Sequence, residues 1–200
     1  VTARSGIVVA GWGMVLAIAA AFLYGLDVNE AARPHLTTNL VLVVIALVLG
    51  IGWAWRSGKK VEMTAMPQMV ALYNGMGGGA AAAIAAVELY SGNAQSHGVV
   101  VTVLAILGGL IGSVALSGSL VAWAKLDGRL NRTIRLPAQQ LINGALFLGS
   151  LAIGAVIVAG GEGYNPTALI TIFFIASLVL GVLLTTPIGG ADMPVVISLY

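Results

Sequence analysis

The sequence contains no cysteine, and only 8% of its 200 residues are charged. The absence of cysteine excludes disulfides, thiolate-bound zinc and thiol catalysis. Soluble domains carry about 25% charged residues, so this chain has too few charges to cover a surface that faces water. Its nine Lys and Arg residues fall in short segments without a basic patch, which gives no support for nucleic-acid binding. With 59% hydrophobic residues, the composition predicts an integral membrane protein.

The hydrophobic residues fall into runs long enough to cross a bilayer. A helix needs about 20 apolar residues, each rising about 1.5 Å, to span about 30 Å of hydrocarbon. We therefore predict an all-α polytopic membrane protein, a transmembrane helix bundle in one domain over residues 1–200, with six full spans and the start of a seventh. The expected spans are 6–24, 37–55, 66–90, 98–126, 137–159 and 166–186, with a truncated helix from 192. The few residues from 192 onward cannot span, so we expect the sequence to be a fragment or an incompletely ordered chain.

The basic residues predict how the spans are oriented. Arg4 precedes the first span, and seven others follow the second and fourth spans, whereas Arg33 alone falls on the opposite side. Positive residues mark the cytoplasmic side of a membrane protein. We therefore expect the start of the chain and the basic loops 56–65 and 125–136 to be cytoplasmic. The loop before Asp192 then lies on the same side.

The stretch from Glu62 to Tyr90 combines an anchored start, a polar group and a run of small residues. Asn74 lies about two turns inside this span, where an amide without hydrogen-bond partners loses several kcal/mol. Bonding between helices, worth about 0.6 kcal/mol, is the ordinary role of such a residue, and a proton or water relay is the alternative. The combination predicts a helix at the centre of the bundle that handles something polar.

Serines on the fourth span are the other polar candidates. A serine hydroxyl within a helix usually donates to a backbone carbonyl of the same helix, which is the ordinary expectation for Ser113, Ser117 and Ser119. The alternative is that these serines line a water path. The candidate proton pathway therefore comprises Asn74, Ser119 and Ser117.

Two glycine pairs have the spacing that allows close contact between membrane helices. They are Gly75 with Gly79 on the third span and Gly108 with Gly112 on the fourth, and we predict that all four pack against neighbouring helices. Each glycine weakens a helix by about 1 kcal/mol relative to alanine, so the dense run from Gly75 to Gly79 exceeds what packing requires. A bend or a water-lined passage beside Asn74 would account for the excess.

The chain contains an internal echo. Residues 66–73 (MPQMVALY) read against residues 193–200 (MPVVISLY), which suggests two related parallel helices. Asp192 precedes the second copy and follows Gly189 and Gly190, a turn with exposed N–H groups that suits docking of a partner domain. An ordinary acidic helix cap explains Asp192 equally well.

No metal site is expected. His35 and His97 fall in loops on the outer side, and the spans contain no His and no cluster of carboxylates. Buried metal ions need several such ligands.

Three runs resemble the membrane domain of the beta subunit of proton-translocating NAD(P) transhydrogenase. They are Lys59–Asn74, Ile188–Tyr200 and Gly118–Leu130 followed by Leu136-Pro137. The resemblance implies a redox-driven proton pump, in which inward proton flow drives hydride transfer from NADH to NADP+ on separate soluble domains. It also implies one more helix before this region, about two after Asp192, and then a cytosolic NADP(H)-binding domain. The helices themselves would lie in a bacterial cytoplasmic membrane.

Within that resemblance, Asn74 stands where many bacterial members have a histidine implicated in proton transfer. An amide cannot titrate near pH 7, whereas histidine can, so we expect the titrating group on another helix, on the alpha-type membrane subunit. Gln68 likewise replaces an acidic residue. Asp192, with Gly189 and Gly190, matches the end that couples to the NADP(H) domain.

The resemblance also implies the partners and cofactors. We expect the alpha-type membrane subunit, the NAD(H)-binding and NADP(H)-binding domains, the lipid bilayer and a homodimer of the heteromeric unit. No cofactor is expected on this chain itself, because NAD(H) and NADP(H) bind elsewhere in the complete enzyme. The alternative is a secondary transporter or channel built on the echoed helices; a nucleotide-binding domain after the seventh helix would discriminate between them. A third option is a passive membrane anchor. Asn74 and the glycine run within a span argue against it, because an anchor needs no polar interior.

Overall fold

The computed structural model describes residues 2–26, 35–92, 98–130, 132–133, 135–160 and 166–193. These residues form helices and turns and no β-strand, which confirms the prediction of an all-α polytopic membrane protein. The chain divides into two units, residues 1–60 and 61–200. Residues 194–200, which contain most of the second copy of the echo, and His97 lie outside the described residues.

The first unit consists of two long helices, α1 (Thr2–Leu26) and α2 (Leu36–Lys60). Their described side chains are exposed or half-buried, with Trp53 76% exposed. At the end of α2 the Lys59 ammonium lies 4.5 Å from the centre of the Trp55 ring, a cation–π contact. Exposed apolar side chains of this density need lipid or another protein chain around them.

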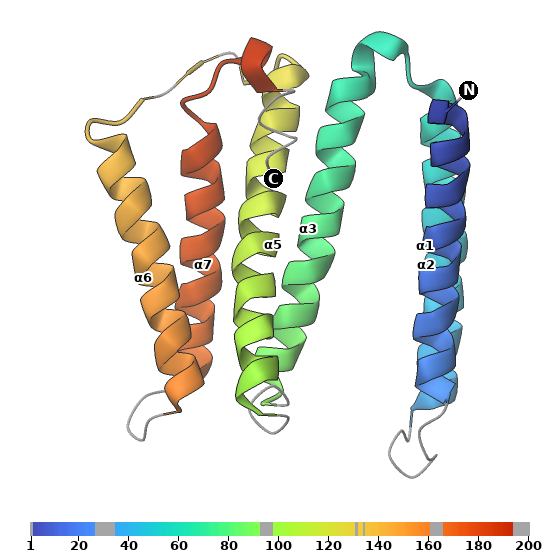
Figure 1. Cartoon of the computed structure of the whole chain (residues 1–200). Helices are drawn as coiled ribbons and strands as arrows, with labels where there is room; N and C mark the ends of the chain where they lie inside the picture. The colour runs from blue at the N-terminus through green and yellow to red at the C-terminus, as the bar shows by residue number, and fades with distance from the viewer. Residues whose placement is uncertain are drawn as a thin grey trace. The chain divides into compact units, whose positions relative to one another are not determined.

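The second unit is a helical bundle (Figure 1). A short 3₁₀ turn, η2 (Met63–Ala65), leads into α3 (Met66–Tyr90), and η3 (Gly190–Asp192) follows the last long helix. The other long helices are α5 (Val99–Leu126), α6 (Gln139–Ala159) and α7 (Pro166–Thr185).

Helix α5 is the centre of this bundle. It packs against α3, α7 and α6, and η3 lies against it as well. Twelve of its residues are buried, compared with five on α3. Within this unit the central helix is therefore α5, and the centrality expected of the Glu62–Tyr90 helix in the whole set of spans stays a prediction. Small residues on two sides of α5 allow neighbours on both, whereas α3 uses its small residues against α5.

The largest apolar cluster lies where α3, α5, α6 and α7 meet, near the start of α5. It consists of Leu89, Ile106, Leu110, Ile157, Ile170 and Phe173. Phe173 is fully buried and meets Phe174 edge to face, with ring centres 5.3 Å apart. A second, smaller cluster of Ala71, Ala122 and Met193 lies at the opposite end of α5. The two clusters fix both ends of the helices that carry the candidate site.

Helix α6 begins two residues later than the expected span. Ala138 has a left-handed backbone conformation with φ of 56°, so helix geometry starts only at Gln139. The Gln139 side chain accepts a hydrogen bond from the Leu136 backbone N–H at 2.9 Å. Pro137 therefore lies in the turn before the helix and not in its first turn.

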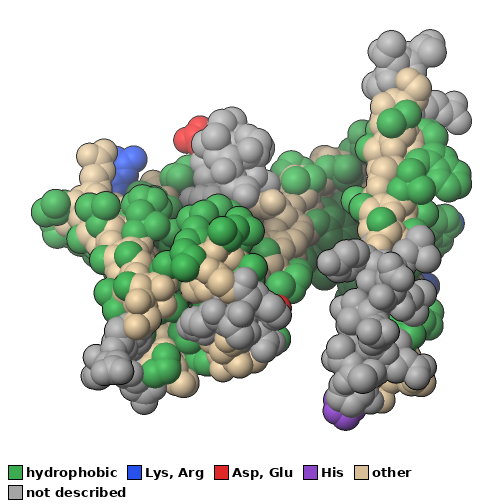
Figure 2. All heavy atoms as spheres, turned by 60° about the horizontal axis from the view of Figure 1, so that its bottom comes forward, with side chains coloured by type: hydrophobic (Ala, Val, Ile, Leu, Met, Phe, Trp, Pro, Cys, Tyr) green, Lys and Arg blue, Asp and Glu red, His purple; other side chains and the backbone are tan. Residues whose placement is uncertain are grey.

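Five helices of the described chain are long and apolar enough to cross a membrane. In α1, the apolar stretch that qualifies, Ser5–Ala20, is shorter, so six full spans stay a prediction. On the face shown in Figure 2, hydrophobic side chains cover most of the described surface and charged ones occur at few points. The helices are built to contact lipid or other apolar protein surfaces.

Candidate functional site

A hydrogen bond joins α3 and α5 about two turns from the start of α3 and the end of α5. The amide nitrogen of Asn74 donates to the hydroxyl oxygen of Ser119 over 3.1 Å. Ser119 has no exposed surface, and Asn74 is half-buried. Two of the three residues of the predicted proton pathway are therefore in direct contact. The bond satisfies polar groups that would otherwise lose several kcal/mol in an apolar setting.

Ser117, the third predicted residue, faces another helix. Its hydroxyl donates to the Ser113 carbonyl one turn earlier, at 3.0 Å, and lies where a side-chain carbon on Gly181 of α7 would be. Residues two apart on a helix point in nearly opposite directions, so Ser119 and Ser117 cannot both reach Asn74. The structure does not bring Ser117 to the Asn74–Ser119 pair.

Glycines allow α3 and α5 to approach closely beside this pair. A methyl group added at Gly78 would lie 2.7 Å from the Ala115 side chain, and one at Gly112 would lie 2.6 Å from the Gly78 carbonyl oxygen. Gly75 lies against Ser119, at 3.0 Å by the same measure. These contacts involve backbone or short side chains, so alanine would push the helices apart.

The other predicted packing glycines behave differently. At Gly79 an added methyl group would meet the flexible end of Leu116 at 3.2 Å, and at Gly108 it would meet nothing within 4 Å. Within the described chain, Gly108 therefore makes no close helix contact, and the tight position is its neighbour Gly109, which lies 3.2 Å from the rings of α7 by this measure. Gly77 also faces open space, so packing alone does not account for the whole glycine run. Helix α3 nevertheless continues as one α-helix through it.

Two grooves run along the line between α3 and α5. Each has a volume of about 390 Å³. Asn74 lines one groove, Glu88 lines the other, and Ala81 and Gly108 line both. The open space beside Gly108 is part of these grooves. The site is thus a polar pair set beside an open groove that is lined mostly by glycine and apolar residues.

The ammonium group of Lys125 is buried at the end of α5, where it holds three backbone carbonyls; we call this arrangement the Lys125 clamp. Only 6% of its surface is exposed. Its ammonium group donates hydrogen bonds to the carbonyl oxygens of Thr185 at 3.1 Å, Ile188 at 2.7 Å and Thr186. The carbonyls at a helix C-terminus lack partners within the helix and carry partial negative charge. Lys125 therefore closes the end of α7 and ties it to α5.

The predicted coupling residues lie next to the Lys125 clamp. In η3 the Asp192 N–H donates to the Gly189 carbonyl at 3.1 Å, and the Asp192 side chain is exposed. A methyl group on Gly190 would lie 3.8 Å from the Lys125 carbonyl oxygen. Ser119 precedes Lys125 by six residues, about 9 Å along the helix. The polar pair and the exposed acid thus lie toward the same end of α5, the end that carries Lys125.

The start of α3 contacts this end too. The Gln68 amide donates to the Leu126 carbonyl at 2.8 Å. Met193 has no exposed surface, whereas Met66, its counterpart in the echo, is 45% exposed. The matching sequences therefore occupy different environments where the structure describes them.

No group of three or more His, Asp or Glu side chains that could hold a metal ion occurs among the described residues. The polar groups that cross the contacts of α5 are the amides of Asn74 and Gln68, the hydroxyl of Ser119 and the ammonium group of Lys125. They suit hydrogen bonding and proton or water contacts rather than cation binding by several carboxylates.

Sequence reasoning missed Gly78, Gly181 and Lys125. The G-x-x-x-G pattern favoured Gly79 over Gly78, and Lys125 was counted with the basic loop although it lies inside α5. A lysine in the last turn of an apolar helix was the available signal, because it is positioned to bond C-terminal carbonyls.

Comparison with known proteins places the chain in a family. A family model described as NAD(P) transhydrogenase beta subunit matches residues 1–200. Two proteins named NAD(P) transhydrogenase subunit beta, from Rhodospirillum rubrum and from one strain of it, are each 35% identical to the chain over 164 residues. The match covers 78% of this chain and 34% of each relative, so the chain spans about a third of their length. The chain thus belongs to the NAD(P) transhydrogenase beta subunit family.

Proposed function

We propose that this chain is the proton-translocating membrane part of a proton-translocating NAD(P) transhydrogenase. In this proposal, hydride moves from NADH to NADP+ on separate soluble domains, which bind NAD(H) and NADP(H), and this chain binds neither. The family supports the enzyme class. The observation that carries the membrane role is the hydrogen bond between Asn74 and Ser119, a polar contact beside a groove within an apolar bundle.

Asn74 and Ser119 would guide the proton without carrying its charge. Neither an amide nor a hydroxyl titrates near pH 7, but each can donate to and accept from a water molecule. The Asn74 groove is open on one side, where a helix of the alpha-type membrane subunit would supply the titrating group. A histidine there would have a suitable pKa for such exchange.

The coupling would occur at the Lys125 end of the bundle. Asp192 is exposed there, while the segment that carries it is held by the three carbonyl bonds of Lys125. A change in hydration at Ser119 would shift α5, and the shift would reach the Lys125 clamp about 9 Å further along the helix. The Asp192 side chain, with the turn at Gly189 and Gly190, would then alter how the NADP(H)-binding domain docks. Coupling of this kind requires two conformational states of the complex, and the proton site and the NADP(H) domain must each stabilise these two states to different degrees.

The test uses the complete complex in lipid vesicles that contain a pH-sensitive dye. Acidification inside is followed during reverse hydride transfer from NADPH, for the unaltered protein, Asn74→Leu and Asp192→Asn. We expect each change to lower proton movement at least about tenfold and to slow hydride transfer with it. Asp127→Asn is the matched control, because Asp127 is an acid at the same end of α5 whose described partner is Arg129.

Co-purification of the subunits establishes that each variant assembles. Normal proton movement in both variants would contradict the proposed pathway and coupling site. Proton movement that continues without any hydride transfer in the unaltered complex would instead favour a transporter or channel without redox coupling.

A further inference from the structure

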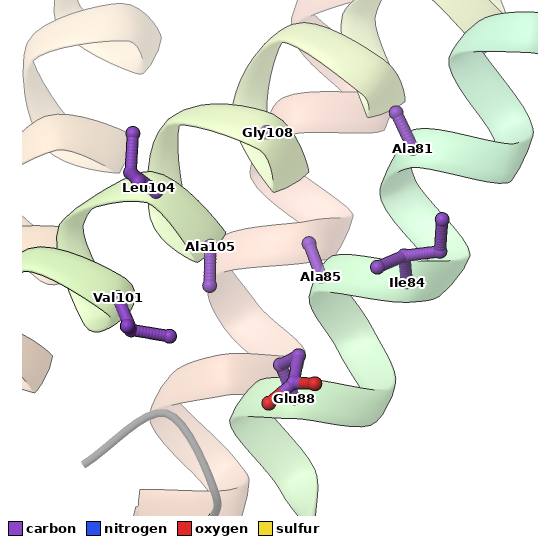
Figure 3. A pocket seen from close by; sticks show the side chains of 8 residues that line it. All are labelled: Ala81, Ile84, Ala85, Glu88, Val101, Leu104, Ala105 and Gly108. Carbon is purple, nitrogen blue, oxygen red and sulfur yellow. The ribbon is translucent and has the colours of Figure 1, made fainter. Parts of the chain in front are cut away.

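The second groove between α3 and α5 ends at a carboxyl group. Figure 3 shows Glu88 at one end of a row of α3 residues, with Val101, Leu104 and Ala105 of α5 along the other side. Besides Glu88, the residues that line this groove are alanine, valine, leucine, isoleucine or glycine. The carboxyl group is therefore the one ionisable group among the described residues that line the groove.

One oxygen of this carboxyl group is buried without a hydrogen-bond partner. The Glu88 Oε2 atom has no accessible surface and no partner among the described residues. The neighbouring hydroxyl of Tyr90 is shared with Thr171 of α7 at 2.8 Å, and the Ser91 hydroxyl donates to the Val87 carbonyl at 2.6 Å. The polar side chains closest along the chain are thus engaged elsewhere.

Among the described residues, little balances a negative charge on Glu88. Glu88 lies two residues before the end of α3, where the helix carbonyls already present partial negative charge. The described Lys and Arg residues of this unit all lie in the last turn of α5 or after it: Lys125, Arg129, Arg132 and Arg135. Within the described chain, no basic side chain at this end of the groove pairs with the Glu88 carboxyl group.

The Glu88 groove leads toward the polar pair. It shares Ala81 and Gly108 with the groove lined by Asn74. Glu88 and Asn74 are separated by 14 positions on one helix, about 21 Å along its axis. Water molecules in the two grooves would connect the carboxyl group with the amide.

We propose that Glu88 is a proton-binding residue of this chain, at the end of the α3–α5 seam opposite Lys125. Its carboxylate takes a proton from hydronium in the adjacent aqueous phase, which forms a carboxylic acid and releases water. The acid then gives the proton to water in the groove, which restores the carboxylate and sends the charge toward Asn74. This role rests on the proposed proton-translocating function and adds a titrating site to it.

The experiment compares Glu88→Gln and Glu88→Asp in the complete complex in dye-filled vesicles. Glutamine keeps the size of the side chain but cannot bind a proton in this pH range, so we expect proton movement to fall at least about tenfold. Aspartate should restore a substantial part of it. Glu62→Gln is the matched control, because Glu62 precedes the same helix but is exposed, and it should stay within about twofold of the unaltered complex.

A second measurement reads the carboxyl group directly. The infrared difference between acidic and neutral samples should contain a buried carboxylic acid C=O band that disappears in Glu88→Gln and persists in Glu62→Gln. Proton movement within about twofold of normal in Glu88→Gln, or an unchanged infrared difference, would overturn the proposal. If the unaltered complex moved no protons, the proposed function would fail, whereas normal movement in the complex and in Glu88→Gln would remove only Glu88.

Discussion

Helix α5 packs against α3 and α7 through different faces, and the two contacts hold their buried polar groups in different ways. Toward α3, the Asn74–Ser119 bond and the bond from Gln68 to the Leu126 carbonyl cross between helices. Toward α7, the hydroxyls of Ser117 and Ser177 bond to carbonyls of their own helices. The main polar link across that side is Lys125 at its end.

This difference separates a contact that can exchange partners from one that is fixed. Bonds that cross between helices can be replaced by water when the helices shift, and the described grooves lie on the α3 side. The α7 side instead buries Phe173, Ile170 and Leu110 in an apolar cluster, and back-bonded serines stay satisfied whatever the neighbouring helix does. We therefore expect changes during turnover on the α3 side, with α5 and α7 as the scaffold.

The largest effect on stability is expected from Lys125→Met. Three carbonyls near the end of α7 would lose their charged donor, and unsatisfied buried acceptors cost about 1–3 kcal/mol each. With partial relaxation we expect a loss of about 3 kcal/mol in the free energy of unfolding. Lys125→Arg should recover little, since a planar guanidinium does not fit a site formed around a compact ammonium. Thermal unfolding of the detergent-solubilised complex measures the loss, and an unchanged midpoint in Lys125→Met would exclude the clamp.

Gly112→Ala is expected to have the next largest effect. The added methyl group would lie 2.6 Å from the Gly78 carbonyl oxygen, and overpacking of this kind costs about 1–3 kcal/mol. Gly108→Ala is the matched change on the same helix, with nothing within 4 Å, and should be neutral or stabilise the helix by up to about 1 kcal/mol. The same thermal measurement compares them. Equal destabilisation by both changes would mean that Gly108 packs against a partner outside this chain.

The sequence predicted much of the framework. Helix α3 begins and ends at Met66 and Tyr90, the limits expected from the length of the apolar run and the proline at its start. Gly75, Gly112 and Asn74 were selected as residues of a helix contact, and they lie at one. Periodicity and hydropathy suffice to locate the helices, because a chain segment in a membrane must hydrogen-bond its own backbone and therefore forms a helix.

Partners across the contact could not be read from the sequence. Ser117 and Ser119 have the same chemistry and similar depth, but the order of the helices around α5 decides which one meets Asn74. The same holds for Gly78 and Gly79, which differ by about 100° around α3. The similar sequences that begin at Met66 and Met193 also did not indicate that Met66 is exposed and Met193 is buried, because the neighbouring helices determine burial.

A smaller effect is expected from Gln68→Leu, at the Lys125 end of the α3 contact. The change removes the hydrogen bond from the Gln68 amide to the Leu126 carbonyl, which is 2.8 Å long. A single bond of this kind contributes about 1 kcal/mol. Thermal unfolding should register this loss with assembly intact. A loss as large as that of Lys125→Met would show that both sides of α5 are held equally firmly, against the distinction drawn above.

Ser119→Ala is expected to change stability least and function most clearly. Hydrogen bonds between membrane helices contribute about 0.6 kcal/mol on average, so the unfolding midpoint should move slightly. Proton movement in the vesicle assay should nevertheless fall severalfold, because the change leaves Asn74 without its partner at the groove. Ser117→Ala removes a hydroxyl bonded within α5 and should leave proton movement near normal, and Ser177→Ala on α7 serves as the control for loss of a buried, back-bonded hydroxyl. If Ser117→Ala impaired proton movement as much as Ser119→Ala while both complexes stayed intact, the proton route would involve both faces of α5, and the α7 side could no longer be regarded as scaffold.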